Sequence, residues 1–140
     1  MNAILDTNVV SELMRPAGDV QLRAWVDGQA PQTLFLTSIN VAEIRIGIAL
    51  LVPGRRRQIL ADRFESELLP KFGDRVLPFD VEATGPHAEI VARSRRAGRP
   101  VSHFDALIGA IAYVRGMSVV THDTAPFETA GVAVLNPWEA

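Results

Sequence analysis

Four acidic residues follow or open the apolar segments of this sequence. Asp6 directly follows one apolar run, and Asp123 lies just past another. Glu43 and Asp105 sit near the starts of two amphipathic stretches. Carboxylates that meet raise one another's pKa unless cations neutralise them, and Mg²⁺ binds through a few carboxylates, waters and substrate phosphates. Two such ions about 4 Å apart can hold the attacking and leaving oxygens of a phosphodiester displacement.

Each acid also has an ordinary structural explanation. Asp105 and Glu43 each follow a serine or asparagine by three residues, which is the spacing of a helix capping box. Asp6 could simply cap the helix that follows, and Asp123 could form an Asx turn. The metal hypothesis therefore depends on the four acids meeting in the fold. A further acid at the end of an apolar run, Asp80, precedes a helical pattern, and we interpret it as an N-cap.

The elements that must position these acids alternate between short apolar runs and longer amphipathic stretches. The predicted strands are Ala3 to Leu5, Leu34 to Thr37, Arg75 to Phe79, Met117 to Thr121 and Val132 to Leu135. The predicted helices are Thr7 to Met14, Val20 to Gln29, one that starts at Ser38 or Asn40 and stops before Pro53, Arg55 to Leu69, Glu82 to Ala97 and Ser102 to Arg115.

Strands separated by long helices pair in parallel through right-handed crossovers. We therefore expect an α/β fold, a three-layer α/β/α domain with a central parallel sheet of four to five strands. Ligands of such sheets bind outside the carboxyl ends of the strands, where the strand order reverses. All four acids can face that edge.

The composition fits one globular domain spanning residues 1–140, with 48% apolar and 21% charged residues. A net charge of −2 excludes a chain that is basic overall, so any polyanion must be held locally. The absence of cysteine excludes disulfides, thiolate metal sites and a cysteine nucleophile. No apolar run approaches the roughly 18 residues of a membrane span, and the first residues lack the basic region of a signal peptide. We expect a cytoplasmic protein.

Four segments resemble the PIN-domain ribonucleases, and more narrowly the VapC toxins of the FitB-like kind. The segments are Ile4-Leu5-Asp6-Thr7-Asn8, Val41-Ala42-Glu43-Ile44, Asp105-Ala106-Leu107-Ile108-Gly109-Ala110-Ile111-Ala112 and Thr121-His122-Asp123-Thr124. The chain also ends in Asn-Pro-Trp, as those toxins similarly do. The motifs occur in the same order and at matching separations, so the resemblance spans nearly the whole chain.

The resemblance implies a PIN fold and the toxin component of a type II toxin–antitoxin system. Its activity would be that of an Mg²⁺- or Mn²⁺-dependent endoribonuclease, in which metal-activated water hydrolyses RNA to 5′-phosphate and 3′-hydroxyl ends. The partners would be a cognate VapB- or FitA-type antitoxin and a second copy of the chain in a homodimer. By motif, the catalytic metal-binding residues would be Asp6, Glu43, Asp105 and Asp123, with Thr7, Asn8, Thr121 and Thr124 assisting the substrate.

Two histidines depart from the family pattern. His122 stands where the family commonly has arginine, and His103 precedes the third acid where small residues are usual. Imidazole nitrogen would suit Mn²⁺ better than Mg²⁺, so a role as metal ligand is one alternative. Helix-end or solvent-facing roles are the other, and we favour them because sequence neighbours can point apart.

Two groups of arginines are candidates for contacts with RNA phosphates. The residues concerned are Arg55, Arg56, Arg95, Arg96 and Arg99. They could equally be solvated helix faces, and arginine near a helix C-terminus also complements the helix dipole. Aromatic residues make up only 6% of the chain, so recognition of bases by stacking is not evident. Apolar positions such as Trp25 and Ile48 belong either to the core or to a groove for an antitoxin helix.

Two other functions remain as alternatives. An aspartyl-phosphate phosphatase or receiver-like domain would use Asp6 as nucleophile and would need a lysine near the phosphoryl group. The only lysine is Lys71, which precedes the third predicted strand. The other alternative is a non-catalytic PIN module that only docks a partner, although the presence of all four acids argues against it.

Overall fold

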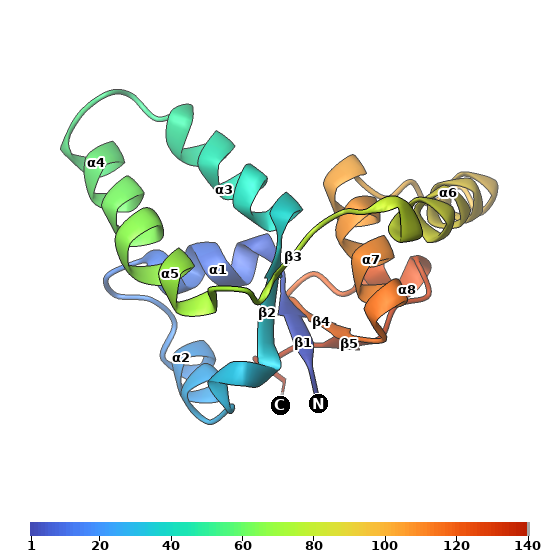
Figure 1. Cartoon of the computed structure of the whole chain (residues 1–140), viewed down its shortest axis with the longest axis horizontal. Coiled ribbons are helices and arrows are strands. Elements are labelled where there is room, and N and C mark those ends of the chain that lie inside the picture. Colours follow the sequence, from blue (N-terminus) through green and yellow to red (C-terminus); the bar gives the residue numbers. More distant parts are fainter. Residues whose placement is uncertain (140) are drawn as a thin grey trace.

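The computed structural model describes residues 1–139 and contains a five-stranded parallel sheet (Figure 1). The strands are β1 (Ala3–Leu5), β2 (Leu34–Thr37), β3 (Val76–Leu77), β4 (Ser118–Val120) and β5 (Val134–Leu135). Their order is β3-β2-β1-β4-β5, and all neighbours pair in parallel. After β1, the chain adds β2 and β3 on one side of β1 and later adds β4 and β5 on the other side. The strand order therefore reverses between β1 and β4, which is where such sheets bind ligands.

Helices cover both faces of the sheet. One face carries α1 (Thr7–Met14), α2 (Val20–Asp27), α3 (Ser38–Ala49), α4 (Arg55–Asp62) and α5 (Leu69–Phe72). The other carries α6 (Val81–Arg96), α7 (His103–Arg115) and α8 (Ala125–Thr129). Figure 1 shows the first group to the left of the sheet and the second to the right. The three-layer α/β/α prediction is confirmed.

The core has two parts, one on each face of the sheet. Along β1, Ala3 and Leu5 are buried among the helices α1 to α4, whereas Ile4 is buried against α6, α7 and α8. This alternation follows from the two-residue period of a strand. Because both faces are covered, β1 is apolar throughout, and the first polar residue after it, Asp6, lies at the edge of the sheet.

Capping side chains set where the helices begin. Asp6 accepts the N–H of Thr7, and Asp80 accepts the N–H of Ala83, so the interpretation of Asp80 as an N-cap is confirmed. The helix after β2 differs from expectation, since Thr37 is its N-cap and Asn40 is the partner in the first turn. Both members of that capping box are buried, so the hydrogen bonds between them fix the direction in which α3 leaves β2.

Other differences from the predicted elements are local. The stretch predicted as one helix from Arg55 contains a π-helical segment, Arg63–Leu68, between α4 and α5. The third and fifth strands are only two residues long. The sequence pattern also missed a short 3₁₀ turn, Pro31–Thr33, and α8, because single turns are too short to show a period. No helix within residues 1–139 is long and apolar enough to cross a membrane.

Candidate active site

Asp6 occupies the switch point of the sheet and is almost enclosed. It is the N-cap of α1 directly after β1, and only 5% of its surface is exposed. Its Oδ1 accepts the N–H of Thr7 at 2.8 Å, and its Oδ2 accepts the hydroxyl of Thr121 at 2.8 Å. These two donors fix the carboxylate in one orientation. The capping explanation is thus correct for Asp6, but capping alone does not require burial.

Thr121 forms hydrogen bonds with both Asp6 and Asp123. Thr121 is fully buried at the end of the segment that carries β4, and its Oγ1 also accepts the N–H of Asp123 at 3.1 Å. One hydroxyl therefore connects the acid that follows β1 with the backbone of the acid that follows β4. Asp123 itself is exposed, so its carboxylate lies at the mouth of the site.

Glu43 reaches the same place from α3. Its Oε1 accepts the hydroxyl of Thr7 at 2.7 Å, and that hydroxyl accepts a hydrogen bond from Nδ2 of Asn40 at 3.0 Å. The amide oxygen of Asn40 accepts both the N–H and the hydroxyl of Thr37 at 2.8 Å. A chain of hydrogen bonds thus runs from the end of β2 to Glu43. Because Thr37 and Asn40 are completely buried, this chain holds the Glu43 carboxylate from inside the fold.

Asp105 comes from the first turn of α7 and is half-buried. Its backbone N–H donates to Oγ of Ser102 at 3.2 Å, so the capping role of Ser102 is confirmed. The Ser102 hydroxyl also bonds to the Asp105 side chain and opposes the rise of its pKa. The helices α7 and α3 contact each other, which brings Asp105 near Glu43.

The charges of the acids influence one another. Burial raises the pKa of Asp6 from 3.8 to about 6, and the charges of Asp105 and Glu43 add to this rise against the opposing hydrogen bonds from Thr121 and Thr7. The pKa of Glu43 is raised by burial and by Asp105, and the pKa of Asp105 is raised by burial and by Asp123. No positive side chain contributes to these shifts. The site is therefore a set of carboxylates whose charge the protein leaves uncompensated.

The donor set fits a hard divalent cation. All its groups are oxygens, and the acids come from four separate elements around one edge of the sheet. Within residues 1–139, no three acidic or histidine side chains are close enough to enclose an ion by themselves. A divalent cation held there would therefore need water or substrate oxygens as further ligands.

The remaining candidates from the sequence are distributed around the acids. Asn8 is exposed on α1, and Thr124 is the N-cap residue of α8 without a side-chain cap bond in the described part of the chain. The His122 ring contacts the Trp138 ring, with centroids 4.9 Å apart. The His103 ring instead lies 6.1 Å from the ring of His87. Both histidines are exposed and have aromatic neighbours, and whether either binds a metal stays a prediction.

The two arginine groups lie on different faces of the fold. Arg55 and Arg56, at the start of α4, line a groove that also includes Thr7 and Glu43. Arg95 and Arg96 lie in the last turn of α6, which covers the opposite face of the sheet, and Arg99 follows in the next loop. The structure thus brings only the first group to a hollow that contains one of the acids.

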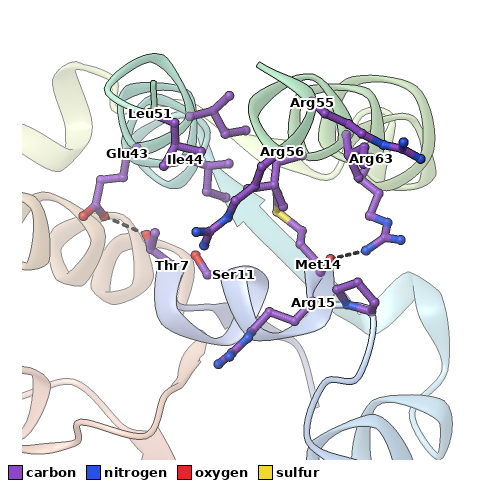
Figure 2. Close-up of a pocket in the computed structure, with 15 residues that line it drawn as sticks. Thr7, Ser11, Met14, Arg15, Glu43, Ile44, Leu51, Arg55, Arg56 and Arg63 are labelled. Atoms are coloured by element: carbon purple, nitrogen blue, oxygen red, sulfur yellow. Dashed lines mark hydrogen bonds between the residues drawn. The ribbon is translucent and has the colours of Figure 1, made fainter. Parts of the chain in front are cut away.

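The groove has a volume of about 960 Å³ and runs between α1, α3 and α4. Its floor is apolar, with Ile44, Ile48 and Ile59 among the lining residues. Figure 2 shows Glu43 bonded to Thr7 at one end of the groove and the Arg56 side chain reaching from α4 toward Ser11. Ile59 of α4 lines this groove and is 40% exposed.

Sequence reasoning missed two functional contributors. Asn40 was considered only as a cap, whereas it also holds the Thr7 hydroxyl. Trp138 was noted only as part of a C-terminal motif, whereas it contacts the residue before Asp123. The buried polar position of Asn40 on an otherwise apolar helix face was the available signal for the first.

Comparison with known proteins decides the family. The PIN domain family model matches residues 3–132. This chain belongs to the PIN-domain family. Three PIN-family relatives match nearly full length. Plasmid stability protein StbB of Pseudomonas syringae pv. tomato is 50% identical, with 98% of this chain and 99% of the relative covered. VapC ribonuclease Y4jK of Sinorhizobium fredii is 44% identical, with 97% of each covered.

The third relative, Toxin FitB of Neisseria gonorrhoeae, is 39% identical, with 96% of this chain and 97% of the relative covered. The crystal structure of FitAcB from the same organism superposes with a TM-score of 0.91 at 38% identity, covering 99% of each chain. The resemblance to the VapC toxins of the FitB-like kind is therefore confirmed over the whole PIN domain.

Proposed function

We propose that this PIN domain is the toxin of a type II toxin–antitoxin pair and acts as an endoribonuclease that depends on Mg²⁺, with Mn²⁺ as a substitute. The observation that carries the proposal is the buried Asp6 carboxylate, whose pKa is raised by burial and by two neighbouring acids without any compensating cation from the protein. The names of the VapC and FitB relatives support both the ribonuclease and the toxin assignments.

The residues that would hold the metal are Asp6, Glu43, Asp105 and Asp123. A bound cation there would activate a water for attack on the RNA phosphodiester and offset the charge of the phosphate. Thr121 and the Thr7 backbone N–H keep both Asp6 oxygens aimed in fixed directions. The Thr7 hydroxyl donates to Oε1 of Glu43. This bond fixes the orientation of the carboxylate, and so also the direction in which Oε2 points. Pre-positioned acids of this kind need no reorganisation when the substrate arrives.

We propose that the groove beside the acids contributes to substrate binding through Arg55 and Arg56. Guanidinium groups bind phosphate oxygens in a two-pronged geometry. Arg56 reaches across the groove toward α1, whose first residue is bonded to Glu43 (Figure 2). An RNA backbone that enters along this groove would meet positive charge before it meets the acids.

The same groove supports a proposal for the partner. We propose that a cognate antitoxin of the VapB or FitA type covers it with an apolar segment that carries acidic residues, because the floor is apolar and the rim is basic. An Ile59→Glu substitution should abolish the complex with the antitoxin. Val81→Glu, at an exposed apolar residue outside the groove, is the matched control.

We further propose that the chain forms a homodimer, which light scattering would measure.

The aspartyl-phosphate alternative is not supported by the structure. Lys71 lies in α5 and lines a hollow with Arg23 and Arg63, away from the acids. A phosphoryl group at Asp6 would thus have no lysine beside it.

The non-catalytic alternative is decided by incubating purified protein with a structured RNA. Cleavage that requires Mg²⁺ and stops with EDTA supports the nuclease, and its absence with Mg²⁺ and Mn²⁺ would favour a docking module.

A further inference from the structure

Helix α1 separates two hollows, and the acids lie at its N-terminal end. Thr7 and Ser11 line the groove described above. Asn8 and Glu12, each one residue further on, line a second, smaller hollow. Residues four apart share one face of a helix, so these pairs mark two different faces of α1. The smaller hollow therefore lies on a different face of α1 from the groove.

The wall of this hollow is aromatic. His122 and Trp138 both line it, and their rings meet edge to face with centroids 4.9 Å apart and planes at 79°. The C-terminal segment that carries Trp138 is held in place, because Gln21 Nε2 donates to its carbonyl at 2.7 Å. The Trp138 N–H also donates to Oδ1 of Asn136 at 3.0 Å. His122 directly precedes Asp123 in the chain.

The rest of the lining is polar and lacks a basic residue. It consists of Asn8, Glu12 and Asp19. Asn8 is exposed, and its side chain makes no hydrogen bond within residues 1–139. Asp19 accepts the N–H of Leu22 at 2.8 Å, and this bond, together with bonds from the Trp138 side chain and the Gln21 N–H, lowers the pKa of Asp19, so the carboxyl group is ionised at neutral pH. The hollow thus offers acceptors and a ring surface, but nothing that would attract a phosphate.

We propose that this hollow is a nucleobase subsite, which takes a base next to the scissile phosphate of the RNA. The inference rests on the proposed ribonuclease function and adds a specificity determinant to it. Aromatic rings provide the surface on which unpaired bases stack. The volume of about 310 Å³ suits one base rather than a larger group. The phosphates on either side of that base would be directed to the acids and away from Asp19.

The polar groups select among the bases. A carboxylate only accepts hydrogen bonds, so Asp19 favours a base edge that carries N–H donors. Guanine presents two such donors side by side on its Watson–Crick edge, and Asn8 can satisfy a neighbouring acceptor. We therefore expect guanine to be preferred at one position next to the cut. The low aromatic content of the chain concealed this site, because its two rings come together only through the fold.

The first test compares cleavage of RNAs in which each nucleotide flanking the cut is varied among the four bases. Asp19→Asn keeps the cap of α2, because asparagine also caps helices, but replaces the carboxylate with an amide. Asp27→Asn makes the same change at the exposed other end of α2 and is the control. The guanine preference should fall about tenfold in Asp19→Asn and stay unchanged in Asp27→Asn. An identical base preference in the parent and Asp19→Asn would overturn the proposal.

The second test measures binding without cleavage. The chain has two tryptophans, so Trp25→Phe leaves Trp138 as the only one. In EDTA, guanosine 5′-monophosphate should quench Trp138 fluorescence more than uridine 5′-monophosphate, and Asp19→Asn should reduce that difference. Equal or absent quenching by both nucleotides would contradict the base subsite. Quenching that depends on Asp19, in a protein that cuts no RNA, would reject the ribonuclease proposal and retain the binding site.

Discussion

The hydroxyl of Thr121 donates to Oδ2 of Asp6 at 2.8 Å, while the same oxygen accepts the N–H of Asp123 at 3.1 Å. One small side chain thus fixes the distance between two acids that follow neighbouring strands. The bond also opposes the effect of burial on the pKa of Asp6. Thr121 is therefore a positioning residue whose loss should change both the geometry and the charge of this carboxylate site.

Thr121→Val should weaken Mg²⁺ binding more than it weakens the fold. Valine has nearly the same shape, but it leaves the Asp6 oxygen and the Asp123 N–H without partners. Residues that orient metal ligands typically contribute roughly 10- to 100-fold in affinity. Calorimetric titration with Mg²⁺ measures the loss, and Thr121→Ser should restore most of the affinity. Equal affinities in Thr121→Val and the parent would remove Thr121 from the site.

Asn40→Ala should reduce both stability and activity. The substitution leaves the N–H and the hydroxyl of Thr37 without their buried acceptor, which costs about 1–3 kcal/mol per unsatisfied group, and removes the amide that donates to the Thr7 hydroxyl. Denaturant unfolding measures the stability change. Cleavage at saturating RNA should also fall, because Glu43 loses its support through Thr7. Thr7→Val should reproduce the loss of activity with a smaller loss of stability, and Thr7→Ser should retain both.

Stability of the metal-free protein should fall as the pH rises from about 4 to 7. Asp6 has a pKa of 3.8 when unfolded and about 6 when folded, so the folded state binds more protons in this range. At about 1.4 kcal/mol per pKa unit, the loss is roughly 3 kcal/mol above pH 7. Asp6→Asn should flatten this part of the profile. Mg²⁺ should raise the melting temperature of the parent more at pH 7.5 than at pH 5, and a larger rise at pH 5 would contradict the assignment.

Arg56→Ala and Arg96→Ala should have different effects on RNA. Arg56 lines the groove that contains Glu43, whereas Arg96 ends a helix on the opposite face of the sheet. Loss of one phosphate contact lowers the slope of log affinity against log salt by about one. Binding of a non-cleavable RNA over a range of salt concentrations should show this change for Arg56→Ala alone. Similar slopes in Arg56→Ala and the parent would place the RNA elsewhere.

The fold could be predicted well from the sequence because the main helices are long enough to show a helical repeat of apolar residues and because the strands are apolar runs. The helices α1, α6 and α7 were located within one or two residues, since capping acids and serines mark where they begin. The π-helical segment near Phe64 could not be predicted, because it depends on how that fully buried ring packs against the sheet. Single turns and two-residue strands similarly depend on tertiary contacts and not on local pattern.

Strand ends and helix starts predicted that the acids share one edge of the sheet, and the charges of Asp6, Glu43 and Asp105 influence one another's pKa values. Their role as metal ligands stays a prediction, and the hydrogen bonds that support them could not be predicted. The hydrogen bond from Asn40 to Thr7 spans 33 residues, and no spacing in the sequence encodes it. The division of the arginines between two faces likewise follows from the topology alone.

The most direct test is the cleavage of a structured RNA by purified protein and its Asp6→Ala variant in the presence of Mg²⁺. Asp27→Ala, an exposed acid far from the site, serves as the control. The account predicts that the parent and the control cut the RNA, that EDTA stops them, and that Asp6→Ala is at least about 100-fold slower. Cleavage at the parental rate by Asp6→Ala would show that this carboxylate site does not perform the reaction.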